Sequence, residues 1–191
     1  MRASVSPARE VALLACMVAL LHVGKQALNF LPNIEVVTLL LIVYTLGFGW
    51  KRSLLVAVAF TALEMTVWAI HLWVVMYIYI WPFLILLTHL LRRNRSVIFR
   101  ALFSAAFGLF FGMMAALPYI VTIGLPGAVA WWVSGIPFDL MHAGGNFALC
   151  LVLFRPLIYL TDRVRSVFHR DPPDRVEDGK TGEEEGASET R

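Results

Sequence analysis

Three polar side chains in the last third of the chain are spaced so that they share one helical face. Asp139, His142 and Asn146 occupy positions i, i+3 and i+7 of the run Gly-Ile-Pro-Phe-Asp-Leu-Met-His-Ala-Gly-Gly-Asn, and residues three or four apart are neighbours on an α-helix. A carboxylate and an imidazole one turn apart can share a proton as an acid–base pair. With an amide beside them, they can also hold a polar ligand by hydrogen bonds.

The chain that carries these residues has the composition of a membrane protein. Of its 191 residues, 59% are hydrophobic and 15% are charged, whereas a soluble domain averages about 45–50% and about 25%. An ionisable group at membrane depth costs roughly 2.5–3.5 kcal/mol and normally faces a cavity or a partner. We therefore predict an integral membrane protein, without a separate soluble catalytic domain, in which the polar face forms a ligand pocket or a polar lock between helices.

A helix that crosses a membrane needs about 20 mainly apolar residues. Six segments of the chain meet or nearly meet this requirement. The candidate spans are approximately residues 10–30, 34–50, 53–72, 75–91, 98–122 and 137–160. We expect an all-α membrane protein with a six-transmembrane-helix bundle in residues 1–165. Residues 166–191 are rich in acids, proline and glycine and cannot bury enough apolar surface to fold, so we predict a disordered acidic cytoplasmic tail.

Basic residues predict the orientation of these spans, because Lys and Arg concentrate on the cytoplasmic side. With the N-terminus in the cytoplasm, Lys25 falls on the outer side and all other bases near the spans fall on the inner side. The inner bases are Arg2, Arg9, Lys51, Arg52, Arg92, Arg93, Arg95, Arg100, Arg155, Arg163 and Arg165. An even number of spans then places the C-terminus in the cytoplasm as well.

The start of the last span has its own signals. Pro137 fits the first position of a helix, and Gly135 fits the turn before it. Asp139 would then lie in the first turn, where the helix dipole favours a negative charge. The dipole does not explain His142 and Asn146, which lie deeper in the same span and remain candidates for binding a ligand or a neighbouring helix.

Aromatic residues gather near the predicted outer side of the membrane. Flat apolar walls with a few converging polar groups are typical of small-molecule sites, so we predict a pocket that opens outward. The predicted ligand contacts are Asp139, His142, Asn146 and Asn33, with Trp131, Trp132, Tyr77 and Trp81 as aromatic walls. Glu35 is expected at the outer mouth. Glu64, in the third span, is expected to be protonated or paired, and both structural and functional roles remain open for it.

Small residues recur every four positions in two spans. Ser104, Gly108, Gly112 and Ala116 form such a stripe in the fifth span, which predicts close helix packing within the bundle. A second stripe lies in the first span, at Ala8, Ala12, Ala15 and Ala19, with Cys16 among them. Because that stripe lies in the cytoplasmic half of the span, another subunit could dock there.

Several classes of function find no support in the sequence. Cys16 and Cys150 lie in apolar runs without metal-ligand spacing, so no metal or other cofactor is predicted. The basic residues follow membrane orientation, so no nucleic-acid partner is predicted either. The chain lacks a G-x-x-x-x-G-K-[ST] run, and any ATP-driven step would therefore require a partner.

The runs at residues 31–39 (LPNIEVVTL), 79–82 (YIWP) and 135–139 (GIPFD), the last followed by His142 and Asn146, resemble the substrate-binding S component of energy-coupling factor (ECF) type ABC transporters. The resemblance implies a six-helix protein of the cell membrane that binds a vitamin or related micronutrient at a site open to the outside. It also implies partners, namely a transmembrane T component and two cytoplasmic ABC ATPases. In that family, small residues on the first helix contact the T component, and Ala8, Ala12, Ala15 and Ala19 occupy that region here.

Two other functions remain open. An intramembrane enzyme would use Asp139 and His142 as its acid–base pair, although no nucleophile motif or metal motif accompanies them. A non-transporting membrane scaffold, similar in its helix plan to MreD-like proteins, would use the polar face to lock its helices together. The ligand itself is not fixed by the sequence, although the many aromatic residues favour a ring-bearing molecule.

Overall fold

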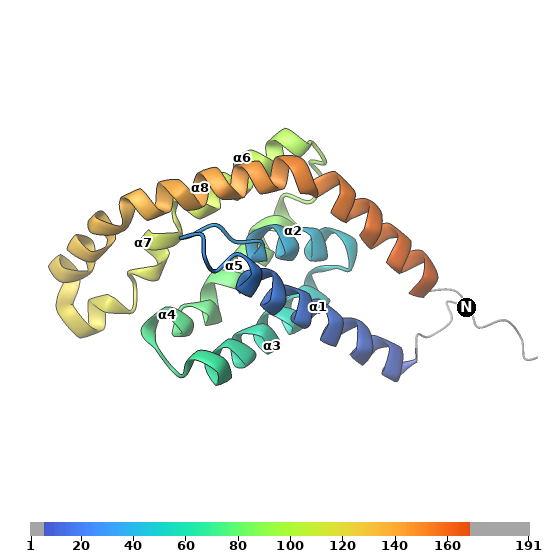
Figure 1. Cartoon of the computed structure of the whole chain (residues 1–191), viewed down its shortest axis with the longest axis horizontal. Coiled ribbons are helices and arrows are strands. Elements are labelled where there is room, and N and C mark those ends of the chain that lie inside the picture. Colours follow the sequence, from blue (N-terminus) through green and yellow to red (C-terminus); the bar gives the residue numbers. More distant parts are fainter. Residues whose placement is uncertain (1–5, 169–191) are drawn as a thin grey trace, which may run out of the picture.

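The computed structural model describes residues 6–168, and over that range the chain is helical and contains no strand. The predicted all-α class is therefore confirmed for the described residues. The helices are α1 (Pro7–Ala27), α2 (Val37–Gly47), α3 (Trp50–Trp68), α4 (Leu72–Val75), α5 (Tyr77–Leu90), α6 (Val97–Leu109), α7 (Phe111–Ala115) and α8 (Tyr119–Phe168). Figure 1 shows α8 as a long arch across the bundle, with α6 along it.

Four helical segments are long and apolar enough to cross a membrane: Pro7–Ala27, Leu72–Leu90, Val97–Ala115 and Tyr119–Phe168. They correspond to the predicted first, fourth, fifth and sixth spans. The other two predicted spans coincide with α2, an apolar helix of 11 residues, and α3, which has 19 residues and includes Lys51, Arg52 and Glu64. The chain is thus a helical protein with several segments suited to a bilayer.

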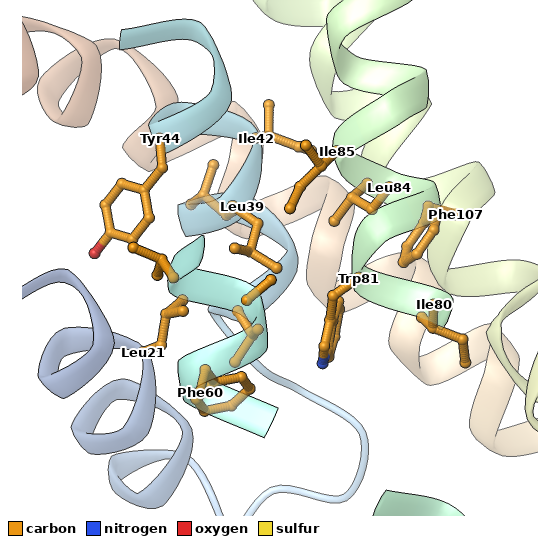
Figure 2. Packing of buried hydrophobic residues seen from close by; sticks show 14 of the residues in the cluster. Leu21, Leu39, Ile42, Tyr44, Phe60, Ile80, Trp81, Leu84, Ile85 and Phe107 are labelled. Carbon is orange, nitrogen blue, oxygen red and sulfur yellow. The ribbon is translucent and has the colours of Figure 1, made fainter. Parts of the chain in front are cut away.

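The short helix α2 forms the centre of the bundle. Eight of its 11 residues are buried, and it packs against α1, α3, α5 and α8. A helix that is apolar on every face is stable only when it is enclosed. The core around it includes Leu39 and Ile42 of α2, Phe60 of α3, and Trp81 and Leu84 of α5 (Figure 2).

Helix α8 differs from the predicted sixth span. It begins at Tyr119, is interrupted at Gly124 (φ 73°), and then passes through Pro126, Pro137 and Pro156. The prediction that Pro137 opens the last helix is therefore wrong, and the dipole explanation for Asp139 loses its basis. Proline inside an apolar helix is tolerated where neighbouring helices and local adjustments satisfy the freed backbone groups. At a rise of about 1.5 Å per residue, the length of the 50 residues of α8 is more than twice the roughly 30 Å thickness of the hydrocarbon core.

The helix pairs have defined directions. Helices α1 and α3 run parallel, because Glu10 bonds Arg52 near their N-terminal ends and Lys25 bonds Glu64 near their C-terminal ends. Helices α3 and α5 run antiparallel, since Phe60 stacks on Tyr77 whereas Trp50 contacts His89.

Further contacts define the direction of α8 relative to α2 and α6. It runs parallel to α2, because a Cβ on Gly47 would meet Thr161 while Ile34, just before α2, lies against Gly145. It runs antiparallel to α6, because Ser104 is opposite Asn146 whereas Gly112, at the start of α7, is opposite Asp139.

Near its end, α8 continues to Phe168, three residues into the segment predicted as the acidic tail. The rest of that predicted tail, residues 169–191, lies outside the described residues, as do residues 1–5.

Candidate functional site

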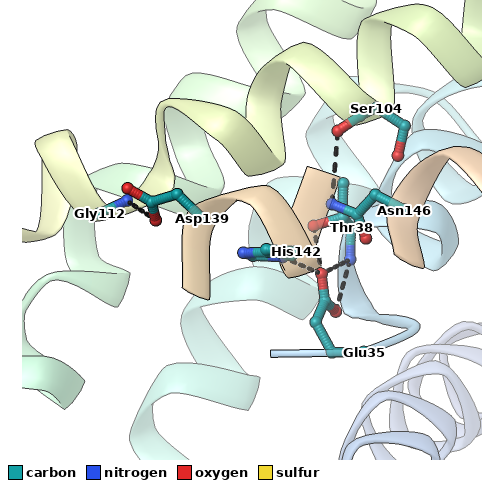
Figure 3. Close-up of polar contacts among 7 residues, drawn as sticks. All are labelled: Glu35, Thr38, Ser104, Gly112, Asp139, His142 and Asn146. Atoms are coloured by element: carbon teal, nitrogen blue, oxygen red, sulfur yellow. Dashed lines mark hydrogen bonds and ion pairs between the residues drawn. The ribbon is translucent and has the colours of Figure 1, made fainter. Parts of the chain in front are cut away.

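Glu35 joins the start of α2 to the middle of α8. Its carboxylate accepts hydrogen bonds from the backbone N–H of Thr38 (3.0 and 3.2 Å) and from the Thr38 hydroxyl (2.5 Å), which satisfies the free amide at the beginning of α2. The same carboxylate lies 3.1 Å from Nε2 of His142. Figure 3 shows the imidazole directed from α8 toward this carboxylate.

The electrostatic state of Glu35 follows from these contacts. Glu35 belongs to the connection between α1 and α2, outside the apolar helices. Burial alone would raise the pKa of Glu35, but the hydrogen bond and charge of His142, together with the hydrogen bonds from Thr38, outweigh burial and hold that pKa below its usual value. Glu35 is therefore ionised at neutral pH, and both of its oxygens can only accept hydrogen bonds.

Asp139 and Asn146 contact the helices opposite α8. Asp139 Oδ1 accepts the backbone N–H of Gly112 at 2.9 Å, and Asn146 Nδ2 donates to the backbone carbonyl of Ser104 at 3.3 Å. With His142 between them, the three side chains lie on one face of α8 and are 4%, 3% and 1% exposed. The predicted shared face is confirmed, and it is buried inside the bundle.

Glycines on the facing segment make this approach possible. A Cβ on Gly112 would overlap the Asp139 carboxylate, and a Cβ on Gly108 would lie 3.0 Å from the amide nitrogen of Asn146 and from the backbone of α8. Ser104, Gly108 and Gly112 therefore pack directly against the polar face. The small-residue stripe predicted in the fifth span is a close-packing surface.

Each of the three polar side chains keeps one buried atom without a hydrogen bond: Asp139 Oδ2, His142 Nδ1 and Asn146 Oδ1. A buried polar atom left unpaired costs about 1–3 kcal/mol, and such groups are few in native proteins. Trp81 Nε1 and Ser104 Oγ, on the elements packed around this face, are also buried and unpaired. The site therefore holds unused hydrogen-bonding capacity in an enclosed setting.

A line of aromatic rings leads to this polar face. Tyr77 contacts Trp81 with centroids 5.1 Å apart, Trp81 contacts Phe111 at 5.8 Å, and Phe111 meets the His142 ring edge-on at 4.7 Å. Two predicted aromatic residues, Tyr77 and Trp81, thus reach the polar face through Phe111. Phe111 was not singled out in the sequence, because a phenylalanine in an apolar run carries no distinguishing signal.

The other predicted site residues lie elsewhere. Trp131 is 39% exposed and stacks on Tyr119 at 4.5 Å, near the N-terminal end of α8. Trp132 is half-buried and lies beside the Asp139 carboxylate. Asn33 is exposed and adopts φ 55° in the connection before α2. Ligand contact by these residues, as by the other predicted site residues, stays a prediction.

A second polar cluster surrounds Glu64. This carboxylate is fully buried, lies 2.7 Å from His22 Nδ1, and forms an ion pair with Lys25. The Lys25 ammonium also lies over Trp73 (4.9 Å), Tyr77 (5.5 Å) and Trp68 (5.9 Å), in the geometry of cation–π contacts. Glu64 is therefore paired, as expected. Its ion-pair partner is Lys25, the single Lys or Arg predicted on the outer side.

Comparison with known proteins adds no further constraint: the chain matches no family model, and no curated protein or solved structure is significantly similar to it.

The Asp139 carboxylate and the His142 imidazole make separate contacts. Asp139 Oδ1 is engaged by a backbone amide, and His142 Nε2 faces Glu35. No hydrogen bond joins Asp139 to His142, and no group of three or more potential metal ligands is found among the described residues. The face thus carries oriented hydrogen-bonding atoms beside aromatic rings.

Proposed function

We propose that this protein is the substrate-specific membrane subunit of an ECF-type transporter, which captures a vitamin or related micronutrient at the outer face for ATP-driven uptake by partner subunits. The observation that carries the proposal is the set of unpaired buried atoms on Asp139, His142 and Asn146. A purely structural polar contact would be expected to satisfy its own atoms, whereas a ligand site holds some of them in reserve.

The helix directions support the six-span plan with both termini in the cytoplasm. If the predicted spans alternate across the membrane, the first and third must be parallel, as must the second and sixth. The third and fourth must then be antiparallel, as must the fifth and sixth. All four relationships agree with the contacts of α1 with α3, α2 with α8, α3 with α5, and α6 with α8.

Charge placement supports the same orientation. Lys25 is the single Lys or Arg near the spans that falls on the outer side. Its charge is neutralised by the ion pair with Glu64. The site would then open on the side where Glu35 caps α2, which is the outer side in this arrangement.

The first helix carries the surface that we propose for partner docking. Ala8, Ala12, Ala15 and Ala19 are all exposed in the isolated chain, which suits a face that packs closely against another membrane subunit. This docking with a T component, and through it with two ABC ATPases, is part of the proposal because the chain lacks a nucleotide-binding motif of its own.

The MreD-like scaffold is the alternative that a specific observation favours. Glu35, Asp139 and Asn146 each make at least one hydrogen bond within the bundle, and these bonds hold α2, α6 and α7 against α8. Under that reading the polar face contributes stability and binds nothing.

Native mass spectrometry of the gently purified protein tests the proposal. We expect a co-purified adduct of vitamin size that is lost in the Asp139→Ala variant and retained in Asp162→Ala, which removes an exposed carboxylate from the same helix. Both variants must show wild-type helical content. A wild-type protein without an adduct, and without a thermal shift across a vitamin panel, would support the scaffold instead.

A further inference from the structure

A buried arginine near the start of α6 keeps hydrogen-bond donors that no other group uses. Arg100 is fully buried, and its Nη2 donates to the carbonyls of Leu91 (2.8 Å) and Asn94 (2.6 Å) in the connection between α5 and α6. The Nε and Nη1 atoms of the same guanidinium are buried and unpaired. Because a guanidinium stays protonated in proteins, Arg100 is a buried cation with two donors in reserve.

No carboxylate in the described range, residues 6–168, balances this charge. The carboxylates of that range belong to Glu10, Glu35, Glu64, Asp139 and Asp162. None of them forms an ion pair with Arg100. The ring of Phe99 lies 5.6 Å from the guanidinium carbon, but it carries no charge. A buried charge is costly unless it is paired, so Arg100 requires an anion that these residues do not supply.

The surroundings of this guanidinium also favour a negative group. The connection that its Nη2 contacts carries three further arginines, Arg92, Arg93 and Arg95, which are all exposed. Helix α6 begins directly after this connection. No hydrogen bond among the described residues uses the backbone N–H groups of Val97 and Ile98, the first two residues of α6. Free amides at a helix N-terminus attract anions, so the guanidinium, the connection and the helix start all favour the same charge.

Exposed apolar side chains lie beside these positive groups. Leu90 and Leu91, where α5 ends, are 64% and 38% exposed, and Ile98 and Leu102 of α6 are 63% and 56% exposed. Ile98 and Leu102 are four residues apart and therefore share one face of α6. That helix belongs to Val97–Ala115, one of the segments suited to a bilayer. A positive cluster at the end of a lipid-facing apolar strip matches a molecule that is anionic at one end and apolar at the other.

We propose that Arg100 is the centre of a binding site for the phosphate group of an anionic phospholipid, whose acyl chains lie along the exposed strip of α6. Arginine suits this role because its planar fork of donors matches phosphate oxygens. The phosphate enters by displacing part of the connection over the guanidinium and accepts hydrogen bonds from Nε and Nη1. In the proposed orientation the site faces the cytoplasmic leaflet, where anionic lipids are concentrated. The proposal does not depend on ligand capture, since it applies to a transporter subunit and to a scaffold alike.

Lipid titration of the full chain, followed by native mass spectrometry, tests the proposal. The probes are phosphatidylglycerol, phosphatidylcholine with the same acyl chains, and inorganic phosphate. We expect the wild type to bind phosphatidylglycerol at least about tenfold more tightly than phosphatidylcholine, whose choline offsets the phosphate charge. Arg100→Gln should remove most of this preference. Arg163→Gln, which removes an exposed arginine near the end of α8, should retain it.

A second variant covers the case in which Arg100→Gln does not fold. The double variant Arg93→Gln/Arg95→Gln changes only exposed side chains and should also reduce the preference. Equal binding of the two lipids by the wild type, or equal losses in Arg100→Gln and Arg163→Gln, would overturn the proposal. Binding of inorganic phosphate that depends on Arg100, without a preference between the lipids, would overturn it in favour of a soluble anion. A lipid preference that appears only when residues 183–185 are changed from Glu to Gln would assign the site to the chain's own acidic residues instead.

Discussion

The Glu35 carboxylate and the His142 imidazole are separated by 107 residues in the chain and meet at 3.1 Å in the structure. The Glu35 carboxylate thereby caps the central helix α2 through its bonds with Thr38 and ties α2 to α8 through its bond with His142. Positioning of a binding group by a neighbour that also shapes the fold is how rigid sites are generally built.

Acid should loosen this contact. Because the folded protein holds the pKa of Glu35 below its usual value, the carboxylate adds stability that is present above the unfolded-state pKa, near 4.5. That stability is lost as the pH falls through the lower, folded-state pKa. Thermal unfolding of the wild type should therefore fall off below about pH 4.5, and the Glu35→Gln variant should lack this part of the decline. Identical profiles for both proteins would contradict the assigned role.

Enlarging Gly112 should disrupt the site directly. A Cβ there would overlap the Asp139 carboxylate, so Gly112→Ala should cost about 1–3 kcal/mol of stability, as overpacking does, and should weaken ligand binding. Gly144→Ala is the matched control, because a Cβ at that helical position meets nothing within 4 Å, and alanine is the better helix former. Equal effects of the two substitutions in a denaturation series would exclude the close packing of α7 on α8.

The two ion pairs between α1 and α3 should differ in strength. Glu64→Gln leaves Lys25 and His22 without a charged partner in a site where they are only 19% and 23% exposed, and we expect a loss of about 3 kcal/mol. Glu10→Gln removes the partner of Arg52 where both side chains are about 30% exposed, and should cost no more than about 1 kcal/mol. Chemical unfolding of both variants measures the two losses of stability. Equal losses for Glu10→Gln and Glu64→Gln would contradict the expectation that the more buried ion pair contributes more.

Substitution on the exposed face of α1 should separate assembly from folding. Ala12→Trp adds bulk where the isolated chain has open surface, so its stability should change by no more than about 0.5 kcal/mol. Ligand binding should also persist. Pull-down from native membranes should nevertheless lose the ATPase-containing complex, whereas Ile98→Trp, on exposed α6 surface, should retain it. Retention of the complex by Ala12→Trp would argue against docking through this face.

Features of the fold and of the polar face could be predicted from the sequence where they depend on residues close together in the chain. The shared face of Asp139, His142 and Asn146 follows from helical periodicity, which a sequence displays directly. The same holds for the small-residue stripe that runs along α6 and α7. The start of α8 was mispredicted because Gly135 and Pro137 together mimic a helix start, while the break occurs at Gly124. In an apolar chain, the need to satisfy backbone groups internally overrides that local signal.

Partners across long separations could not be predicted in the same way. Glu35 was placed only at the outer mouth, and its bond to His142 depends on how α2 and α8 pack together. Glu64 was expected to be paired, but Lys25 and His22 became identifiable as its partners only once α1 lay parallel to α3. Phe111 is one of 13 phenylalanines, and only tertiary packing distinguishes it from the rest.

The stability of the ligand-free Asn146→Leu variant separates a binding site from a structural lock. This change removes the unpaired Oδ1 together with one hydrogen bond to a carbonyl. If the polar face is a binding site that holds unsatisfied atoms in reserve, the variant should unfold at or above the wild-type temperature and should lose all stabilisation by ligand. If the variant is instead destabilised by more than about 2 kcal/mol and still binds, the face is a structural lock and the account is contradicted.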